Sequence, residues 1–266
     1  MHKHITGFSN PTVKYLRSLR DKKHRKRSGQ FLVEGLRLLE DARSVGRVPQ
    51  TLVMAEGRAP HELLARLEAE VAAAGGEVIT TTPDILSKIT GKENAQSVAG
   101  VFDEWDTGLA ALDRTSAPIW LVAQALRDPG NLGTMLRTCD AVGAGGLILI
   151  DDCADPFSAE GVRASMGAVF TVGLAQARWE DFLPWLRQGE GQLVAASLRD
   201  AVPYRGAAYA APCFILVGNE SQGLPEEYEA ACDLRVTMPM RGRADSLNAA
   251  VAGAVLAYEV LATFEK

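Results

Sequence analysis

Cysteine is scarce in this chain of 266 residues, which contains only Cys139, Cys153, Cys213 and Cys232. No two of them have the C-x-x-C spacing that is typical of zinc and redox sites. Disulfide frameworks are typical of small secreted domains that are dense in cysteine, and this chain is not dense in cysteine. We therefore expect buried or idle thiols, with no metal site and no structural disulfide.

Histidine is equally scarce, and the last of the four histidines is His61. Any chemistry in the C-terminal half must therefore proceed without a histidine base. Mechanisms of the Ser-His-Asp and Cys-His types need such a base, so they are disfavoured for that half of the chain.

Long apolar runs are also missing. No uncharged stretch approaches the roughly 20 residues of a membrane-spanning helix, and the N-terminus lacks the apolar core and cleavage site of a signal peptide. Hydrophobic residues make up 47% and charged residues 23% of the chain, which is typical of a globular protein. We expect a cytoplasmic location and no membrane partner.

Positive charge is concentrated at the N-terminus. Residues 1–30 contain nine Lys or Arg against one acidic residue, a local charge of +8, so the remaining residues sum to −13 if the whole chain carries −5. Phosphate contacts dominate nucleic-acid affinity, so this basic arm favours a polyanionic partner, although a solvated tail is the alternative. The densest part is the run Lys22, Lys23, Arg25, Lys26 and Arg27.

Apolar runs alternate with helical patterns along the chain and indicate an α/β fold with two domains. Residues 1–105 are predicted to form a smaller α/β domain, residues 106–117 a linker and residues 118–266 the second domain. In the second domain, strands are expected near 119–122, 147–150, 169–172, 193–196 and 214–217, and helices near 132–142, 158–165, 179–186 and 245–264. Apolar strands between helices indicate a mostly parallel sheet covered on both faces.

Three polar segments follow predicted strands, where ligands of open α/β sheets bind. The first is DPGNLG at 128–133, with Asn131 as a natural helix cap and Arg137 on the helix that follows. The second is GNESQGLP at 218–225. The third is MPMRGRADSLN at 238–248. Each also has a purely structural reading, as a turn, a helix cap or a solvated helix surface.

Together the three segments resemble motifs 1, 2 and 3 of the SpoU/TrmH-type (SPOUT) RNA 2′-O-ribose methyltransferases, in the family's order, over about residues 118–264. The stretch 163–170 (RASMGAVF) is similar to the family's segment between motifs 1 and 2. The basic arm followed by QFLVEG at 30–35 resembles the N-terminal, ribosomal-protein-like substrate-binding domain of members that act on ribosomal RNA. The basic run would then bind RNA phosphates.

The resemblance implies a fold that the patterns do not reveal, namely a parallel sheet with a deep trefoil knot near the C-terminus. Knots are very rare, so general topology rules argue against one. It also implies a homodimer and S-adenosyl-L-methionine as the cofactor. The positions that match the family's cofactor-binding positions are Ser197, Leu198, Gly218, Asn219, Gly223, Met238, Met240, Leu247 and Asn248.

For catalysis the family's motif positions fall on Asn131, Arg137, Glu220, Ser246 and Asn248. A ribose 2′-hydroxyl is a poor nucleophile, so its proton must be removed or polarised. Because a guanidinium stays protonated in proteins, we interpret Arg137 as a group that holds the adjacent phosphate and stabilises developing alkoxide charge.

The resemblance favours 2′-O-methylation of ribosomal RNA, most specifically 23S ribosomal RNA. Transfer RNA is an alternative substrate, and a non-catalytic RNA-binding protein with the same fold is an alternative of another class. A dinucleotide enzyme is disfavoured, because GAGGLI at 143–148 lacks the last glycine of the G-x-G-x-x-G fingerprint and precedes a strand instead of following one.

Overall fold

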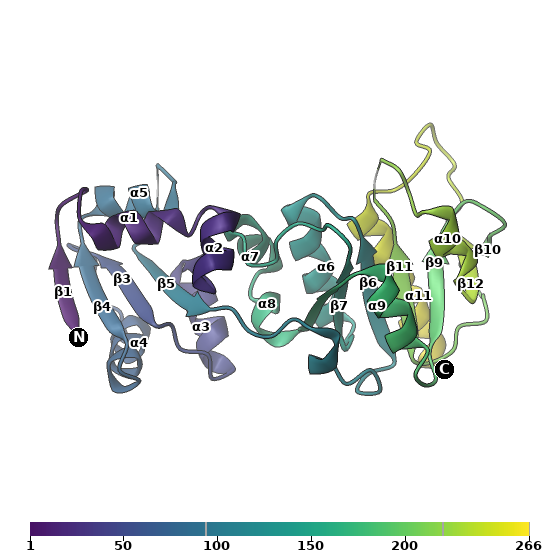
Figure 1. Ribbon diagram of the computed structural model, residues 1–266, viewed down its shortest axis with the longest axis horizontal. Coiled ribbons are helices and arrows are strands. Elements are labelled where there is room, and N and C mark those ends of the chain that lie inside the picture. Colours follow the sequence, from purple (N-terminus) through teal and green to yellow (C-terminus); the bar gives the residue numbers. More distant parts are fainter. Residues whose placement is uncertain (94, 220, 266) are drawn as a thin grey trace. The chain divides into compact units, whose positions relative to one another are not determined.

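The computed structural model describes residues 1–93, 95–219 and 221–265. The chain forms two compact units (Figure 1). The first contains Met1–Trp105 and Asp155–Thr171, and the second contains Asp106–Ala154 and Val172–Lys266. Residues 155–171 therefore group with the first unit, although they lie in sequence between strands of the second. Residues 106–117, which the sequence suggests as a linker, group with the second unit.

The first unit is built on a five-stranded mixed sheet in the order β1-β4-β3-β5-β2. Its strands are β1 (His2–Ile5), β2 (Gln30–Glu34), β3 (Thr51–Ala55), β4 (Glu77–Thr81) and β5 (Val98–Asp103). β1, β4 and β3 run parallel, whereas β5 is antiparallel to both β3 and β2. The helices are α1 (Pro11–Ser18), α2 (Lys22–Ser28), α3 (Leu36–Ser44), α4 (Glu62–Ala73), α5 (Pro83–Thr90), α7 (Ala159–Ser165) and α8 (Ala168–Thr171). The expected small α/β domain is confirmed.

The basic stretch is not an extended arm. It forms the two short helices α1 and α2, which are stabilised by capping residues at their ends. The Asn10 side chain caps α1 through the backbone N–H of Thr12, and the Asp21 side chain caps α2 through the N–H of Lys23 at 2.8 Å. Gly29 ends α2 with a φ of 65°, which glycine adopts without steric cost. Apolar periodicity alone could not predict α2, because its sequence KKHRKRS contains no apolar residue.

Aromatic side chains attach the segment 155–171 to the first unit. The ring centroids of Phe31 and Phe157 are 4.9 Å apart, and those of Phe102 and Phe170 are 5.4 Å apart. The prediction of a strand near residues 169–172 is wrong. Residues 168–171 form the helical turn α8, and the strand β8 (Gly173–Ala177) follows it. A short apolar run fits either a strand or a buried helix. Here the run forms a helical turn, in which Phe170 packs against Phe102.

The second unit has a seven-stranded sheet in the order β10-β12-β9-β11-β6-β7-β8, and every neighbouring pair is parallel. Besides β8, its strands are β6 (Ile119–Gln124), β7 (Gly146–Ile150), β9 (Gln192–Ala196), β10 (Val202–Pro203), β11 (Cys213–Val217) and β12 (Leu234–Thr237). Its helices are α6 (Pro129–Ala141), α9 (Trp179–Leu186), α10 (Glu226–Ala230) and α11 (Ala249–Phe264), and a 3₁₀ turn lies at Leu109–Ala111. The predicted parallel α/β sheet is confirmed.

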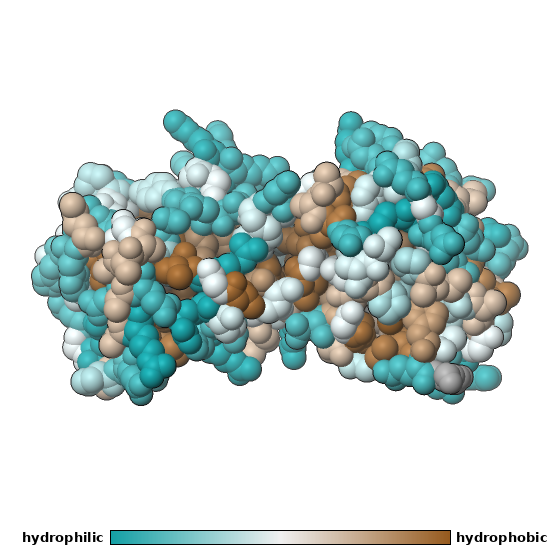
Figure 2. Space-filling model, turned by 90° about the horizontal axis from the view of Figure 1, so that it is seen from below, coloured by the Kyte–Doolittle hydropathy of each residue, from teal (hydrophilic) through white to brown (hydrophobic). Residues whose placement is uncertain are grey.

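The central strands of this sheet are buried on both faces. Every residue of β6, β7 and β11 is buried, as expected when helices cover both sides of a parallel sheet. Strand order does not decide whether the chain is threaded, so the trefoil knot stays a prediction. None of the helices in the described ranges is long and apolar enough to cross a membrane. On the face drawn in Figure 2, hydrophilic side chains predominate, and hydrophobic ones reach the surface in separate patches.

Candidate active site

The three polar segments meet at one edge of the second unit's sheet. They follow β6, β11 and β12, and the segment at Ser197 follows β9. All four strands are parallel and adjacent in the order β12-β9-β11-β6, so their carboxyl ends lie at the same edge. In Figure 1 the loops after β11 and β12 extend to the same side of the sheet. The predicted site is therefore assembled from four consecutive strand ends.

A direct hydrogen bond joins the first and third segments. The Asn248 side-chain amide donates to Oδ1 of Asn131 at 3.0 Å, although the two residues are 117 positions apart in the sequence. Asn248 also caps α11, because its Oδ1 accepts from the backbone N–H groups of Ala250 and Val251. The structure thus brings together two residues that the sequence assigns to catalysis.

The helix caps differ from those expected. Asp128, not Asn131, caps α6, and its carboxylate accepts from the Asn131 N–H at 2.6 Å. The final helix starts at Ala249 and not near residue 245, with Asn248 as its cap. Because α11 starts at Ala249, Ser246 and Leu247 lie in the loop before this helix.

Arg137 lies on α6 with its side chain exposed. No ion pair between Arg137 and another residue of the described ranges is present. An exposed, uncompensated guanidinium can take a phosphate in a bidentate manner. Glu220, the fifth residue assigned to catalysis, lies outside the described residues.

The loop after β11 is tied to the end of β6. The Asn219 side-chain amide donates to the carbonyl oxygen of Ala125 at 2.9 Å, and its Oδ1 accepts from the N–H of Ser221 at 2.8 Å. The loop then closes tightly, because a Cβ at Gly218 would lie 2.6 Å from the carbonyl carbon of Gly223. Asn219 and the two glycines therefore shape the loop, whatever else they bind.

A cavity of about 110 Å³ opens beside these strand ends. Five positions assigned to the cofactor line it, namely Ser197, Leu198, Met238, Met240 and Leu247, together with Ser246 from the catalytic set. Gly218, Asn219, Gly223 and Asn248 are not among its lining residues. Apolar thioether and leucine side chains beside a serine hydroxyl suit a ligand with an apolar ring and a polar tail, as S-adenosylmethionine has.

A buried carboxylate supports the wall of this cavity. The Ser197 hydroxyl donates to Glu229 on α10 at 2.6 Å, and Glu229 is only 7% exposed. The Ser197 Oγ in turn accepts from the N–H of Arg199 at 3.0 Å, so the turn after β9 is fixed from both sides. Glu229 could not be predicted from the sequence, because its contact with Ser197 joins residues that are 32 positions apart.

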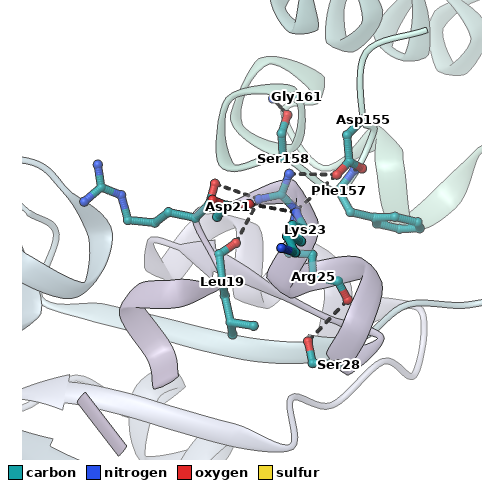
Figure 3. Close-up of polar contacts among 10 residues, drawn as sticks. Leu19, Asp21, Lys23, Arg25, Ser28, Asp155, Phe157, Ser158 and Gly161 are labelled. Carbon is teal, nitrogen blue, oxygen red and sulfur yellow. Dashed lines mark hydrogen bonds and ion pairs between the residues drawn. The ribbon is translucent and has the colours of Figure 1, made fainter. Parts of the chain in front are cut away.

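Four of the five basic residues assigned to RNA are exposed on α2, namely Lys22, Lys23, Lys26 and Arg27. Arg25 is different, since only 3% of its side chain is exposed. Its guanidinium donates to the Asp155 carboxylate at 2.7 and 3.1 Å and to the carbonyl oxygens of Leu19 and Arg20, both at 2.8 Å (Figure 3). The prediction that Arg25 contacts phosphates is therefore wrong for this structure, because its donors are already used within the protein.

The fold and the site define a class of protein. Residues 118–258 match the SpoU rRNA Methylase family, and residues 10–100 match the MRM3-like substrate binding domain. The first match spans more than half of the chain, so the chain belongs to the SpoU rRNA methylase family, as the motifs indicated.

Individual relatives agree over nearly the whole length. The chain is 31% identical to the 23S rRNA (guanosine(2553)-2′-O)-methyltransferase RlmP of Bacillus subtilis, over 97% of this chain and 99% of that protein. It is 29% identical to the 23S rRNA (uridine(2479)-2′-O)-methyltransferase of Streptomyces viridochromogenes, over 91% and 86%. A crystal structure of an AdoMet-bound rRNA methyltransferase from Sinorhizobium meliloti is 38% identical, with a TM-score of 0.92 and 98% of each chain covered.

Proposed function

We propose that this protein transfers a methyl group from S-adenosylmethionine to a ribose 2′-hydroxyl of 23S ribosomal RNA. The observation that carries the proposal is the bond between Asn131 and Asn248, which unites two family motifs at the strand edge beside the cavity. The printed activities of the two curated relatives support the substrate. Those relatives are named for different nucleotides, 2553 and 2479, so the nucleotide methylated here must be mapped by experiment.

The chain's own residues would mainly position the reactants. Bound S-adenosylmethionine supplies an activated methyl group on a sulfonium. Arg137 would hold the phosphate next to the target ribose and stabilise the charge that develops on its 2′-oxygen. Asn131, fixed by Asn248, would orient the ribose, and Ser246 and Glu220 complete the proposed catalytic set. Alignment of this kind can supply a large part of a rate enhancement.

The cofactor would be held by the cavity after β9 and β12. Its lining residues Ser197, Leu198, Met238, Met240 and Leu247 fit the group by chemistry. Gly218, Asn219, Gly223 and Asn248 would contribute by shaping the loop and the helix start next to it. The cytoplasmic location stays a prediction.

The first unit would deliver the RNA. Lys22, Lys23, Lys26 and Arg27 present four exposed positive charges on one short helix. Contacts of lysine and arginine with phosphates release counterions, so binding through them weakens steeply with salt. We expect these residues to bind RNA with little sequence preference, and Arg25 to contribute only by holding α2 in place.

We also propose that the protein is a homodimer. Helix α11 contains a single charged residue in its 16 positions, Glu259, and exposes Val251 and Tyr258 by 46% and 54%. Nearby in the second unit, Leu198 is 72% exposed and Leu247 is 37% exposed. Exposed apolar side chains that gather on one unit favour a protein partner.

The test uses purified protein, tritiated S-adenosylmethionine, and unmodified 23S ribosomal RNA and transfer RNA in separate reactions, with label mapped by nuclease digestion. We expect ribose-methyl label in 23S RNA. Arg137→Ala should reduce the rate by about 100-fold or more, as loss of one key electrostatic contact does. Arg178→Ala, which removes a highly exposed arginine of the same unit, is the matched control and should keep the full rate.

Other outcomes are decisive as well. Label only in transfer RNA would retain the chemistry and overturn the substrate. Binding of the cofactor without label in either RNA would favour the non-catalytic RNA-binding protein.

A further inference from the structure

The first unit contains a second cavity, of about 150 Å³, that takes no part in the site described above. It lies between the end of β2, the start of α3, the segment that follows α5, and α7, all within this unit. One water molecule needs about 10–15 Å³ of such space. The cavity is therefore large enough for a planar ring the size of a nucleobase.

The walls of this cavity are apolar. Leu38 and Val162 line it with side chains that are 8% and 1% exposed. Met166, at the end of α7, lines it as well and is 44% exposed. Met166 has a φ of 51°, an uncommon left-handed conformation for a residue other than glycine. Its flexible, polarisable thioether suits contact with rings of different shape.

The negative charge of Glu34 inside the cavity is compensated. The Glu34 carboxylate forms an ion pair with Lys92 and accepts from the N–H of Gln96 at 2.9 Å. The Gln96 side chain lies over Gly35, where a Cβ would come within 2.6 Å of its Oε1. Among the residues that the structure describes, none forms a hydrogen bond with this side-chain amide. It offers both a donor and an acceptor, which is what the edge of a base requires.

Two arginines complete the lining. Arg37 on α3 and Arg163 on α7 are both exposed, and within the described ranges neither forms an ion pair. A guanidinium binds phosphate in a bidentate manner and stacks on the plane of a base. The cavity therefore combines apolar walls with the Gln96 side-chain amide and the guanidinium groups of Arg37 and Arg163, none of which pairs with another residue that the structure describes. This combination complements a nucleotide, which has a planar base and an anionic phosphate.

We propose that this cavity binds an unstacked nucleotide of the substrate RNA, at a position separate from the methylated ribose. Proteins read RNA sequence mainly through bases that are splayed out of the helix, by stacking and by hydrogen bonds to their edges. The first unit would then select RNA by one base as well as attract it by charge. This inference rests on the proposed RNA methyltransferase function.

Crosslinking tests the location directly. An unmodified 23S RNA fragment carrying photoreactive thionucleosides is bound to the full chain and irradiated, and crosslinked peptides are identified by mass spectrometry. We expect an adduct within residues 34–38 or 159–166 from one nucleotide of the RNA. Adducts confined to α2 or to the second unit would overturn the proposal.

Substitutions at exposed positions test the energetics without endangering the fold. Arg37→Ala and Arg163→Ala should each raise the KM for RNA by about tenfold, which is the loss of one charged contact. Both should leave kcat and the Kd for S-adenosylmethionine within about twofold. Arg66→Ala, on α4 of the same unit and paired there with Glu62, is the matched control and should change neither. Unchanged KM in both pocket variants would contradict the proposal.

A base-specific contact is separated from a general phosphate contact by an RNA that lacks the crosslinked base. Gln96→Ala should weaken binding of intact RNA by about tenfold and leave binding of the abasic RNA unchanged. Equal weakening of both RNAs would overturn base recognition. If the wild-type protein methylates no RNA, the proposed function itself fails. If methylation proceeds and all pocket variants behave as the wild type, only this inference fails.

Discussion

At the residue scale, Asn248 joins a structural role to a functional one, and substitutions can separate them. Asn248→Ala removes the cap of α11 and the bond to Asn131. We expect a loss of about 1 kcal/mol, which lowers the Tm of a protein of this size by about 2–4 °C. Asn248→Ser keeps an oxygen that can cap the helix, so its Tm should stay near that of the wild type while methyl transfer falls. The Tm and the rate are measured on the same preparations. If Asn248→Ser is fully active, the bond to Asn131 is irrelevant to catalysis.

Glu229 is a second residue whose role can be isolated. Its buried carboxylate accepts a hydrogen bond from the Ser197 hydroxyl at 2.6 Å. Glu229→Ala leaves that hydroxyl without an acceptor and frees the turn at 197–199, so we expect the Kd for S-adenosylmethionine to rise about tenfold. Glu229→Gln keeps an acceptor and should cost less. Titration calorimetry measures both. Glu226→Ala, which removes an exposed carboxylate of the same helix, should match the wild type, and equal effects at 226 and 229 would contradict a positioning role.

The buried cysteines make the stability of the folded protein depend on pH. Burial raises the pKa of Cys153 to about 11 and those of Cys213 and Cys232 to about 12, because a thiolate is poorly solvated there. An unfolded thiol ionises near pH 8.5. The neutral thiols therefore contribute their full share to the free energy of unfolding below about pH 8.5, and this contribution is lost as the pH rises toward 11 or 12.

We expect the free energy of unfolding to decrease from pH 8 to pH 10, and to decrease less in Cys153→Ala, because that variant has one buried thiol fewer. Urea unfolding at the two pH values measures both decreases. All other residues are the same in the two proteins, so the difference reports on Cys153. Parallel decreases would exclude the effect.

The site residues show what the sequence could predict at this scale. The order of the motifs predicted that Asn131 and Asn248 belong to one site, since both follow strands of one parallel sheet. It did not predict which residues cap the helices, because Asp128, Asn131, Asp245, Ser246 and Asn248 all have suitable side chains. Nor could it reveal that Arg25 is buried, since its partner Asp155 is 130 residues away.

At the scale of elements, the Arg25–Asp155 ion pair connects α2 with the segment that leads into α7. Its two side chains are 3% and 11% exposed. Removal of one partner from such a pair leaves an uncompensated buried charge, at a cost of about 3–5 kcal/mol. We expect Arg25→Met and Asp155→Leu each to destabilise the first unit strongly, and the double variant to be less destabilised than the two single effects combined. Urea unfolding measures all three.

Lys23→Ala is the control for that series, because it removes an exposed charge from the same helix. It should leave stability unchanged and weaken RNA binding modestly. Strictly additive effects of Arg25→Met and Asp155→Leu would show that the pair is not a coupled unit.

The elements themselves were predictable where the pattern was strong. β6, β7 and β11 are continuous apolar runs between helices, and their assignment is confirmed. Residues 168–171 are also apolar, but their helical turn follows from packing of Phe170 against Phe102. The high charge of residues 1–30 indicated only a basic arm that favours a polyanionic partner. Helices α1 and α2 depend on their caps and on the burial of Arg25, which charge alone does not predict.

At the scale of the whole molecule, the chain crosses between its units three times, after Trp105, Ala154 and Thr171. Sequence order favours units made of continuous segments, so this arrangement could not be predicted. It follows from the aromatic contacts of Phe157 and Phe170 and from the Asp155 ion pair, all of which join residues distant in the sequence. The stretch 163–170, which is similar to the family's segment between motifs 1 and 2, belongs to the first unit. It therefore also lines the proposed nucleotide cavity, through Arg163 and Met166.

We expect two copies of the chain to assemble through the exposed side of α11. A helix that is apolar on most of its surface should be buried on more than one side. One side of α11 packs against α6, β6 and β11, and Val251 and Tyr258 remain exposed. A second copy would cover them, so we expect a dimer by light scattering after gel filtration, and a monomer for Tyr258→Glu.

Val45→Glu places the same charge on an exposed valine of the first unit and should leave the dimer intact. A monomeric wild-type protein would refute the expectation. If Tyr258→Glu is monomeric and also binds S-adenosylmethionine less tightly, the second copy stabilises the cofactor site, because Leu198 and Leu247 line that cavity and still expose much of their surface. Unchanged cofactor affinity in the monomer would instead mean that each chain forms its cofactor site alone.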